Sequence, residues 1–324
     1  MTQITLIVAS SKEIGNGHYV RSSELAKSLK NISPETQVSL FDLVTKNKSF
    51  YISESFKRKT FQSYEIDYKT IDIVVLDLPQ DLMKEKIKYF HKKTKIFCLD
   101  WFGNGPLPDF TINLIDHSKS MAKRYVRNGK KNHYFEGHDW SIIRSEVLEV
   151  KKIRYVKSNT RKVSVLVTIG GSDAKDKTEY AIKLLKKIND EKLNVKVILG
   201  PLVNNRDIER IKLELTNNFE IICSPENFPR LLKESDLILC GGGTTLLEAI
   251  FLAKSIVVFP QTAEEKSHAE IFKKRGACVF PDKLEEILFN ERKRLLLAKN
   301  AENLIDGKGI SRIANLILST NINK

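Results

Sequence analysis

The chain alternates short apolar runs with longer stretches of helical periodicity along its whole length. The clearest apolar runs are Ile4–Ala9, Val38–Phe41, Ile71–Leu76, Lys95–Leu99, Thr111–Leu114, Val163–Ile169, Val195–Leu199, Glu220–Cys223, Asp236–Cys240 and Ser255–Phe259. Because these runs show no strict alternation with polar residues, they predict strands that are covered on both faces. Strands that alternate with amphipathic helices are typical of an α/β fold built on parallel sheets.

The length and one change in composition predict two domains. The chain has 324 residues, whereas a single hydrophobic core stops growing at about 250 to 300 residues. The sequence turns polar and basic between Glu146 and Lys162, and a new strand, glycine turn and helix then begin at Val163. We therefore expect two Rossmann-like domains, residues 1–155 and 156–324, that face one another across a central cleft.

The charge balance favours an anionic partner. The 54 Lys and Arg residues against 40 Asp and Glu residues give a net charge of +14, which suits phosphates, nucleic acid or an acidic membrane face. The early run Ile4–Ala9 is too short for a signal-peptide core, and no later run reaches transmembrane length, so we expect a cytoplasmic protein. The four cysteines lie in apolar stretches without Cys-x-x-Cys spacing, and we expect them to be buried and reduced.

A first glycine turn, Gly15-Asn16-Gly17, separates the first predicted strand from a helix. Glycines let the backbone approach a ligand closely, and the N–H groups at a helix start favour an anion. His18 follows directly and is a candidate general base or acid, with helix capping or packing as the alternative. Arg21 lies one turn further on, where it either reaches a phosphate or sugar or remains a solvated helix residue.

A second turn, Gly241-Gly242-Gly243-Thr244-Thr245, links a predicted strand to the next helix. Three glycines and two capping hydroxyls at a helix N-terminus are typical of a diphosphate site. The turn lacks the lysine of a P-loop and the full Gly-x-Gly-x-x-Gly pattern, which disfavours an ATPase or an NAD enzyme. Glu248, one turn later, is a candidate for hydrogen bonds to ribose hydroxyls, with an ordinary surface glutamate as the alternative.

These residues resemble a known family. The segment GNGHYVRSSELAKSL (15–29) is similar to the opening of the nucleotide-sugar hydrolase of pseudaminic acid biosynthesis, which removes UDP from a diacetamido-trideoxy-hexose. The resemblance continues through IGGSD (169–173) and the segment 240–277, and weakly through YFEGHDWSIIRSEV (134–147). The segment 240–277 also resembles the donor-binding domain of GT-B glycosyltransferases of the peptidoglycan lipid II type.

The resemblance implies a GT-B fold in which the C-terminal domain holds UDP, with no metal and no cofactor. It implies that His18 is the catalytic histidine, which activates water, and that Glu248 contacts the nucleotide ribose. The remaining matched positions are Gly242, Gly243, Thr244 and Thr245 for the diphosphate, and Gly171, Ser172 and Asp173 for the turn of the second domain.

The match breaks at two places. The family carries a tyrosine two residues after the acid that ends one N-domain strand, whereas Pro79 occupies that position after Asp77. Glu264 and Glu265 replace an expected Asn-Gln pair, and carboxylates repel a sugar diphosphate unless they bind hydroxyls or a cation. His268, on the same stretch, either contacts the ligand or occupies an ordinary helix surface.

Two enzyme classes fit these features. In a nucleotide-sugar hydrolase, His18 deprotonates a water while the second glycine turn stabilises the departing UDP. In a GT-B glycosyltransferase, the same base deprotonates an acceptor hydroxyl. The aromatic and basic segment 49–64 is a candidate acceptor contact or a surface loop. The basic segment 81–93 is a candidate contact with anionic lipid, relevant to a transferase, or a helix packed on the sheet.

A third class, nucleic-acid binding, ranks last because the basic runs contain no recognised nucleic-acid-binding motif. His133, His138 and Asp139 match no usual zinc spacing, so we expect surface or packing roles for them. We therefore predict a metal-independent enzyme that acts on a UDP-linked, amino-deoxy sugar in surface-glycan biosynthesis, with hydrolysis favoured over transfer.

Overall fold

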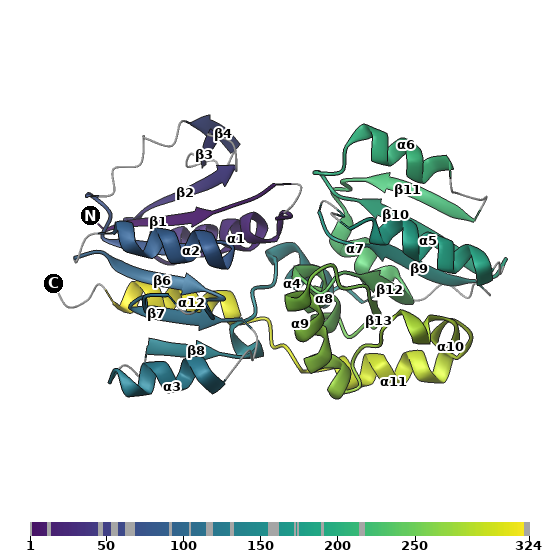
Figure 1. The fold of residues 1–324 in the computed structure, drawn as a ribbon. Helices are drawn as coiled ribbons and strands as arrows, with labels where there is room; N and C mark the ends of the chain where they lie inside the picture. The colour runs from purple at the N-terminus through teal and green to yellow at the C-terminus, as the bar shows by residue number, and fades with distance from the viewer. Residues whose placement is uncertain are drawn as a thin grey trace. The chain divides into compact units, whose positions relative to one another are not determined.

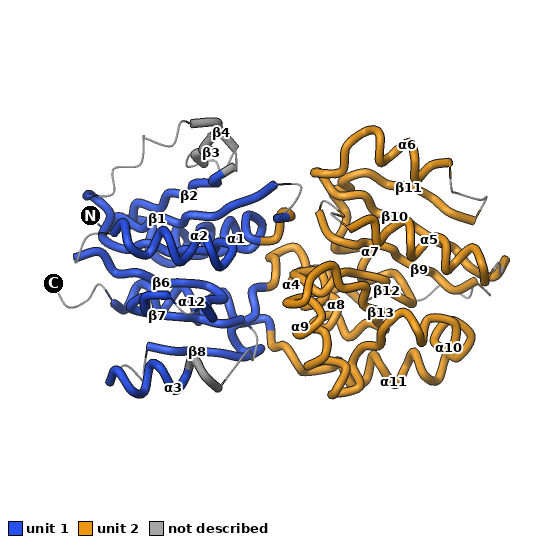
Figure 2. The backbone as a smooth tube through the Cα atoms, in the orientation of Figure 1, with its two compact units in different colours: residues 1–14, 18–142, 307–324 blue, residues 15–17, 143–306 orange. Residues whose placement is uncertain are grey.

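The structure is a computed structural model that describes residues 2–11, 14–44, 48–52, 58–61, 69–90, 93–103, 105–114, 119–129, 133–154, 162–171, 173, 175–188, 191–213 and 218–320. The chain forms two compact units (Figure 2). Unit 1 comprises residues 1–14, 18–142 and 307–324, and unit 2 comprises residues 15–17 and 143–306. Each unit carries one twisted sheet flanked by helices (Figure 1), which confirms the predicted α/β fold class.

The sheet of unit 1 has eight strands in the order β4-β3-β2-β1-β5-β6-β7-β8. Its strands are β1 (Gln3–Val8), β2 (Gln37–Val44), β3 (Lys48–Ile52), β4 (Arg58–Phe61), β5 (Ile73–Asp77), β6 (Lys95–Leu99), β7 (Phe110–Asn113) and β8 (Tyr134–Glu136). All pairs are parallel except β2–β3 and β3–β4. The main helices are α1 (Gly17–Ile32), α2 (Gln80–Lys86), α3 (Lys119–Arg127) and α12 (Gly309–Ser319).

The sheet of unit 2 has five parallel strands in the order β11-β10-β9-β12-β13. The strands are β9 (Val163–Thr168), β10 (Leu193–Leu199), β11 (Phe219–Cys223), β12 (Leu237–Cys240) and β13 (Ser255–Val258). The helices are α4 (Ser145–Lys152), α5 (Lys177–Ile188), α6 (Asn205–Leu213), α7 (Phe228–Glu234), α8 (Thr244–Phe251), α9 (Ala263–Lys274), α10 (Leu284–Phe289) and α11 (Glu291–Ala301). Strands β12 and β13 are buried along their whole length, as their unbroken apolar sequences predict.

All ten strands that the sequence predicts are present. The sequence analysis missed β3 and β4, which fall in the segment 49–64 that we treated as a loop or acceptor contact, and the three-residue strand β8. Strands β3 and β4 form an antiparallel hairpin at the edge of the sheet, where the sequence lacks the continuous apolar run of a doubly covered strand. Residues 53–57 and 62–68 of this segment lie outside the described residues.

The two units divide at different positions from the predicted 155/156 boundary. Helix α4 belongs to unit 2, where Lys233 of α7 donates to main-chain carbonyls at the end of α4. Helix α12 belongs to unit 1, where Arg312 donates to the carbonyl of Asp139 at 2.8 Å. A side chain at Gly309 would meet the carbonyl oxygen of Ser141 at 2.1 Å. Contacts between residues far apart in the sequence define the two units, whereas the predicted boundary rests on a local change in polarity.

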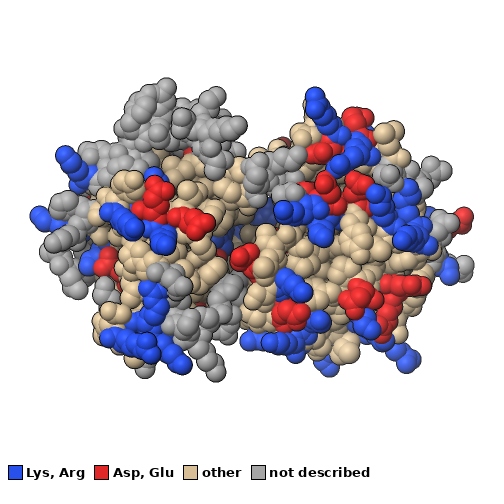
Figure 3. All heavy atoms as spheres, viewed as in Figure 1, with Lys and Arg blue, Asp and Glu red and all other residues tan. Residues whose placement is uncertain are grey.

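Three of the cysteines, Cys98, Cys240 and Cys278, are buried as expected, but Cys223 is exposed. The expectation was wrong there because Cys223 ends β11, the edge strand of its sheet. None of the helices in the described ranges is long and apolar enough to cross a membrane. On the face of unit 2 drawn in Figure 3, basic side chains are interspersed with acidic ones. Arg210 and Asp176 form an exposed ion pair in this unit.

Candidate active site

The candidate catalytic histidine lies at the carboxyl end of the unit 1 sheet. Strands β5 and β6 are parallel neighbours, with Leu76 aligned to Cys98. Each strand is followed at its carboxyl end by an acid, because β5 ends at Asp77 and Asp100 directly follows β6. His18 and Arg21 lie one turn apart near the start of α1, so their side chains share one helix face.

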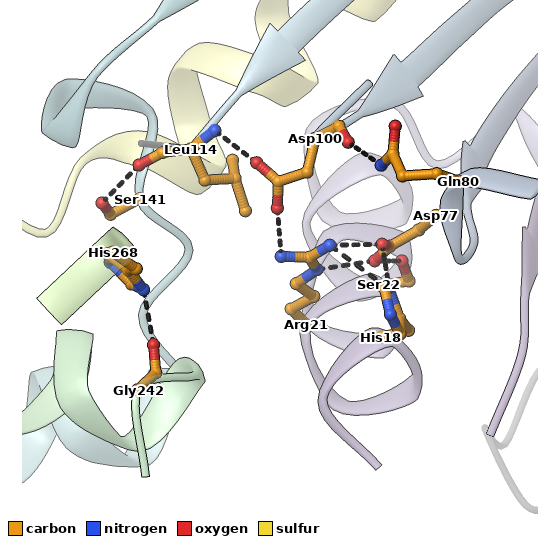
Figure 4. Close-up of polar contacts among 10 residues, drawn as sticks. All are labelled: His18, Arg21, Ser22, Asp77, Gln80, Asp100, Leu114, Ser141, Gly242 and His268. Carbon is orange, nitrogen blue, oxygen red and sulfur yellow. Dashed lines mark hydrogen bonds and ion pairs between the residues drawn. The ribbon is translucent and has the colours of Figure 1, made fainter. Parts of the chain in front are cut away.

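The carboxylate of Asp77 contacts three side chains of α1 (Figure 4). Its Oδ1 lies 2.6 Å from Nδ1 of His18, and its Oδ2 accepts from Nε of Arg21 at 2.8 Å. Ser22 donates its hydroxyl to the same Oδ2 at 2.8 Å. Asp77 is fully buried, and the side chain of His18 is 24% exposed. We call His18, Arg21, Ser22, Asp77 and Asp100 the histidine cluster.

Strong electrostatic coupling holds the histidine cluster together. Burial alone would raise the pKa of Asp77, but the charges of Arg21 and His18 and their hydrogen bonds hold it well below its usual range. Burial alone would lower the pKa of Arg21, but Asp77 and Asp100 raise it above its ordinary value. Asp77 is therefore a permanently ionised partner for His18 near neutral pH.

The contact with Asp77 fixes which nitrogen of His18 is basic. A carboxylate oxygen 2.6 Å from Nδ1 requires a proton on that nitrogen in the neutral ring. Arg21 also approaches Nδ1, at 3.3 Å, but two donors cannot bond each other, and the shorter contact to the carboxylate decides the tautomer. The lone pair of the neutral imidazole therefore lies on Nε2. A partly exposed Nε2 of this kind can remove a proton from a ligand or a water.

Asp100 holds the other side of Arg21. Its Oδ2 accepts from Nη1 of Arg21 at 2.6 Å, and its Oδ1 accepts from the main-chain N–H of Leu114 at 2.9 Å. The backbone of Asp100 is left-handed, with φ of 56°, and Gln80 donates to its carbonyl at 2.6 Å. Nε and both terminal nitrogens of Arg21 therefore donate to carboxylates. In this arrangement Arg21 positions Asp77, and its contact with a phosphate or sugar stays a prediction.

The second predicted site, in unit 2, is the turn between β12 and α8. Gly242 donates its N–H to Oε2 of Glu265 at 3.1 Å, and Gln261 donates its N–H to the same oxygen at 2.7 Å. Nδ1 of His268 lies 2.5 Å from the carbonyl oxygen of Gly242 (Figure 4). A side chain at Gly242 would lie 2.4 Å from the carbonyl oxygen of Glu265, so this position requires glycine. We call Gly241–Gly243, Gln261, Glu265 and His268 the glycine-turn cluster.

The start of α8 differs from the expectation in one respect. Thr244 and Thr245 were expected to cap the helix, but Gly243 is the N-cap and no side chain caps it. The expectation was wrong because both threonines lie inside the first turn, where a hydroxyl cannot occupy the N-cap position. The N–H groups of this turn still have no acceptor within the helix, as at any helix start.

Glu248 lies within α8 and is fully buried. Arg144 forms two parallel hydrogen bonds with it, from Nε to Oε1 and from Nη2 to Oε2, both at 2.6 Å. The guanidinium of Arg144 also lies 5.0 Å from the ring centre of Phe228. The alternative of a surface glutamate is therefore wrong. The ribose contact stays a prediction, and it would require Arg144 to give up part of this pair.

The third predicted turn, after β9, carries Gly171 and Asp173. Asp173 has φ of 47°, and its carboxylate accepts the N–H groups of Lys177 at 2.9 Å and Thr178 at 3.0 Å, at the start of α5. Burial raises the pKa of Asp173 to about 6. Ser172 lies outside the described residues. Ligand contacts by Gly171, Ser172 and Asp173 stay predictions.

The other candidates have simpler positions. Glu264 is exposed in the first turn of α9, and His268 is buried, so the surface alternative for His268 is wrong. The His133 ring stacks on Phe110 with ring centres 4.5 Å apart, and His138 is buried. The described part of the chain contains no group of three His, Cys, Asp or Glu side chains arranged to hold a metal ion.

The sequence analysis missed the residues that orient the candidates. Asp77 was noted only as a landmark beside Pro79, and Asp100 and Arg144 were not singled out. The strand sequences IVVLD and IFCLD carried a usable signal, because an acid at the carboxyl end of two apolar parallel strands lies where α/β folds bind ligands. Arg144 offered no such signal, because its partner Glu248 is 104 residues away.

Comparisons with known proteins agree with this geometry. Residues 164–304 match the model of the glycosyltransferase family 28 C-terminal domain. Solved structures with the same architecture include a Staphylococcus aureus MnaA–UDP co-structure, with a TM-score of 0.66 and 15% identity over 99% of this chain and 98% of that one. Acinetobacter baumannii MurG gives a TM-score of 0.61 with 14% identity over 98% of this chain and 100% of that one. The chain has the GT-B fold.

Two relatives are found by sequence. The GT-B chain is 25% identical to the spore coat polysaccharide biosynthesis protein SpsG of Bacillus subtilis over 325 residues, 94% of each protein. It is 27% identical to an uncharacterized protein of Methanocaldococcus jannaschii over 301 residues. That match spans 89% of this chain and 61% of the archaeal protein.

Proposed function

We propose that this GT-B protein is a nucleotide-sugar hydrolase that releases UDP from a UDP-linked amino-deoxy sugar in surface-glycan biosynthesis. The observation that carries the proposal is the pairing of His18 with the buried, ionised Asp77 at 2.6 Å. A histidine oriented in this way can act as a base, and the atom that accepts the proton is Nε2. The chemistry requires no metal.

In the proposed reaction, Nε2 of His18 removes a proton from a water molecule as the water oxygen attacks the anomeric carbon of the sugar. The bond between that carbon and the diphosphate oxygen breaks, and UDP leaves with the bonding electron pair. Asp77 stabilises the imidazolium that forms, because the carboxylate stays ionised throughout. Base catalysis of this type contributes about 10²- to 10⁴-fold to a rate.

The glycine-turn cluster is the proposed site for the diphosphate. The N-terminus of α8 follows three glycines and presents N–H donors with the positive end of the helix dipole. The family 28 match covers this turn, MnaA was solved together with UDP, and the UDP-GlcNAc 2-epimerase of Neisseria meningitidis was solved with bound UDP-GlcNAc. Donors held in place by the fold stabilise the charge that develops on a departing diphosphate.

A glycosyltransferase is the second candidate, and the family 28 match is the observation that favours it. The same base would then deprotonate an acceptor hydroxyl instead of water. All the residues named above keep their roles in that reaction, so the histidine cluster alone does not distinguish the two.

The test is to incubate the pure protein with a panel of UDP-, CMP- and GDP-sugars and to measure nucleotide release with and without cell extract. Release of UDP without extract supports hydrolysis, and release that requires extract supports transfer. Conversion of one nucleotide sugar into another without release would match the epimerase neighbours and contradict both. A panel in which nothing is consumed, with or without extract, contradicts an enzymatic role.

A further inference from the structure

The diphosphate turn already holds an anion, which is the side chain of Glu265. One carboxylate oxygen accepts N–H donors from two different loops, from Gly242 at 3.1 Å and from Gln261 at 2.7 Å. The same carboxylate lies 3.4 Å from where a Cβ at Gly241 would be and 3.6 Å from the corresponding point at Gly243. Glu265 is therefore packed against all three glycines of the turn.

A second feature supports this placement of Glu265. Thr262 accepts the N–H of Glu265 at 3.1 Å at the start of α9, which fixes the backbone from which the side chain extends. On the other side of the turn, Nδ1 of His268 holds the carbonyl of Gly242. The carboxylate and the N–H of Gly242 are thus fixed from both ends.

A diphosphate and this carboxylate require the same donor. The N–H of Gly242 is one of the groups that the diphosphate would use, and an ionised carboxylate beside it also repels phosphate charge. A protonated Glu265 no longer repels the ligand, and it holds the N–H of Gly242 less strongly, because a hydrogen bond to a neutral carboxyl is weaker than one to a carboxylate. Protonation is the smallest change that makes the occupied turn compatible with a diphosphate.

The surroundings of Glu265 favour that protonation. Burial raises the pKa of the carboxyl above its usual value, although the N–H bonds from Gln261 and Gly242 act in the opposite direction. The ionisable groups that face it are Glu264 and His268 of α9 and the Cys240 thiol at the end of β12. Glu264 raises the same pKa further. A nearby diphosphate adds negative charge in the same sense.

We propose that the carboxylate of Glu265 occupies the glycine turn as an anion that competes with the ligand. Binding of a nucleoside diphosphate there is accompanied by the uptake of one proton onto this carboxylate. This inference rests on the proposed function, since it assumes that the turn binds the diphosphate. It adds a regulation that a glutamine at the same position would lack. The protein binds its nucleotide sugar more tightly as the pH falls, until Glu265 is fully protonated.

The test measures proton uptake directly by titration calorimetry in buffers that differ in their enthalpy of ionisation. The probe is UDP-GlcNAc, because each of its two phosphates carries one ester bond and the shared anhydride bond and has no group that titrates near neutral pH, unlike the terminal phosphate of UDP. The protein carries His18→Ala, which prevents consumption of the probe and removes one titrating group. The series runs upward from about pH 4.3, the ordinary pKa of a glutamate, because the pKa of Glu265 is raised above that value.

We expect the affinity of the His18→Ala protein to fall by up to about tenfold for each pH unit above the carboxyl's pKa. Introducing Glu265→Gln should remove most of the proton uptake, because the amide keeps the N–H contacts without a titrating charge. Glu264→Gln is the matched control, since it removes a charge one residue earlier in the chain; proton uptake should persist but move to lower pH, because the charge of Glu264 raises the pKa of Glu265. Residual uptake in Glu265→Gln measures the contribution of His268.

The outcomes separate this inference from the proposed function. Binding with equal proton uptake in the parent and in Glu265→Gln overturns the proposal that Glu265 takes up the proton and leaves the proposed function intact. If UDP-GlcNAc binds to neither protein at any pH, both the proposed diphosphate site and the proposed role of Glu265 are wrong. If Glu265→Gln does not fold, the parent decides alone, because binding without proton uptake in any buffer excludes the proposal.

Discussion

Asp77 in unit 1 and Glu265 in unit 2 are both carboxylates held beside glycine-containing turns, but their environments move their pKa values in opposite directions. Asp77 contacts the side chains of His18, Arg21 and Ser22, and full positive charge outweighs the effect of burial. Glu265 is held by two neutral N–H groups, and burial outweighs them. The difference shows that the charge of the partners, more than the number of hydrogen bonds, decides whether the pKa of such a carboxyl is lowered or raised.

The comparison has a functional consequence. An ionised Asp77 keeps the tautomer of His18 fixed, so the histidine cluster is preorganised for proton transfer. The glycine-turn cluster is instead satisfied by the protein's own carboxylate, and ligand binding must change it. Variants of the two clusters test this contrast, and the largest effect is expected at His18.

His18→Ala tests whether the histidine cluster acts in catalysis or in binding. We expect turnover of the nucleotide sugar to fall about 10²- to 10⁴-fold, because the base that deprotonates water is lost. Nucleotide affinity should be unchanged, since the proposed diphosphate site is the glycine-turn cluster of unit 2. Steady-state kinetics and calorimetry with UDP measure the two effects separately.

His133→Gln is the control for this prediction, because His133 lies in unit 1 and stacks on Phe110 without contacting the histidine cluster. It should leave turnover within a few-fold of the parent. A His18→Ala protein that loses affinity for UDP as strongly as turnover would show that His18 binds the ligand and would remove the contrast between the clusters.

Arg144→Met tests a fully buried carboxylate of unit 2 that has a full cation beside it. Glu248 is fully buried, and removal of Arg144 leaves its charge without compensation. We expect the free energy of unfolding to fall by about 3 to 5 kcal/mol, measured by urea denaturation. The double variant Arg144→Met/Glu248→Gln should recover part of that loss, because it also removes the buried charge.

A loss no larger than that of Glu248→Gln alone would contradict this account, since it would mean that Glu248 is solvated or protonated when Arg144 is absent. Glu248 would then resemble Glu265 more than Asp77. The ion pair of Arg144 with Glu248 would then be weak enough for ribose hydroxyls to displace Arg144.

The sequence predicted the architecture well because the relevant signals are local. Apolar runs of strand length separated by amphipathic helices were sufficient for ten strands and the fold class. The glycine turns marked the ends of β1, β9 and β12. The edge hairpin β3–β4 was missed because an edge strand has no need of a continuous apolar sequence.

The residues of the candidate sites were predictable only in part. His18 and Gly242 stand next to glycines in the sequence and were identified. Asp77 was not identified, and Glu265 was identified as a candidate but not as the partner of Gly242, because the two acids are 59 and 23 residues away from His18 and Gly242 and meet them only after folding. The sequence also placed carboxylates at 264–265 without showing that one of them would lie against the turn.

The pH dependence of stability tests the contrast between Asp77 and Glu265 directly. The folded pKa of Asp77 is lowered, so its contribution is complete above the unfolded value of about 4 and is lost as the pH falls below it. The folded pKa of Glu265 is raised, so its contribution is complete below the unfolded value of about 4.3 and is lost as the pH rises through the folded pKa. Hydrogen exchange followed by mass spectrometry reports the two regions separately.

We expect peptides that contain β5 to lose protection on acidification below about pH 4, whereas peptides of the β12–α8 turn should lose protection as the pH rises from that value. Glu265→Gln should flatten the second response and leave the first. Parallel responses in both peptides, after correction for intrinsic exchange rates, would mean that the two carboxylates titrate alike.

Thr262→Ala gives the smallest expected effect and tests what holds Glu265 against the turn. The side chain of Thr262 accepts the N–H of Glu265 at 3.1 Å as the N-cap of α9, and loss of such a cap costs about 1 kcal/mol. Thermal unfolding should show this loss in Thr262→Ala and little change in Thr262→Ser, which keeps the hydroxyl. If the cap also fixes the carboxylate, Thr262→Ala should bind UDP-GlcNAc with less proton uptake than Thr262→Ser. Equal uptake would mean that the N–H groups of Gly242 and Gln261 hold Glu265 in place without help from the start of the helix.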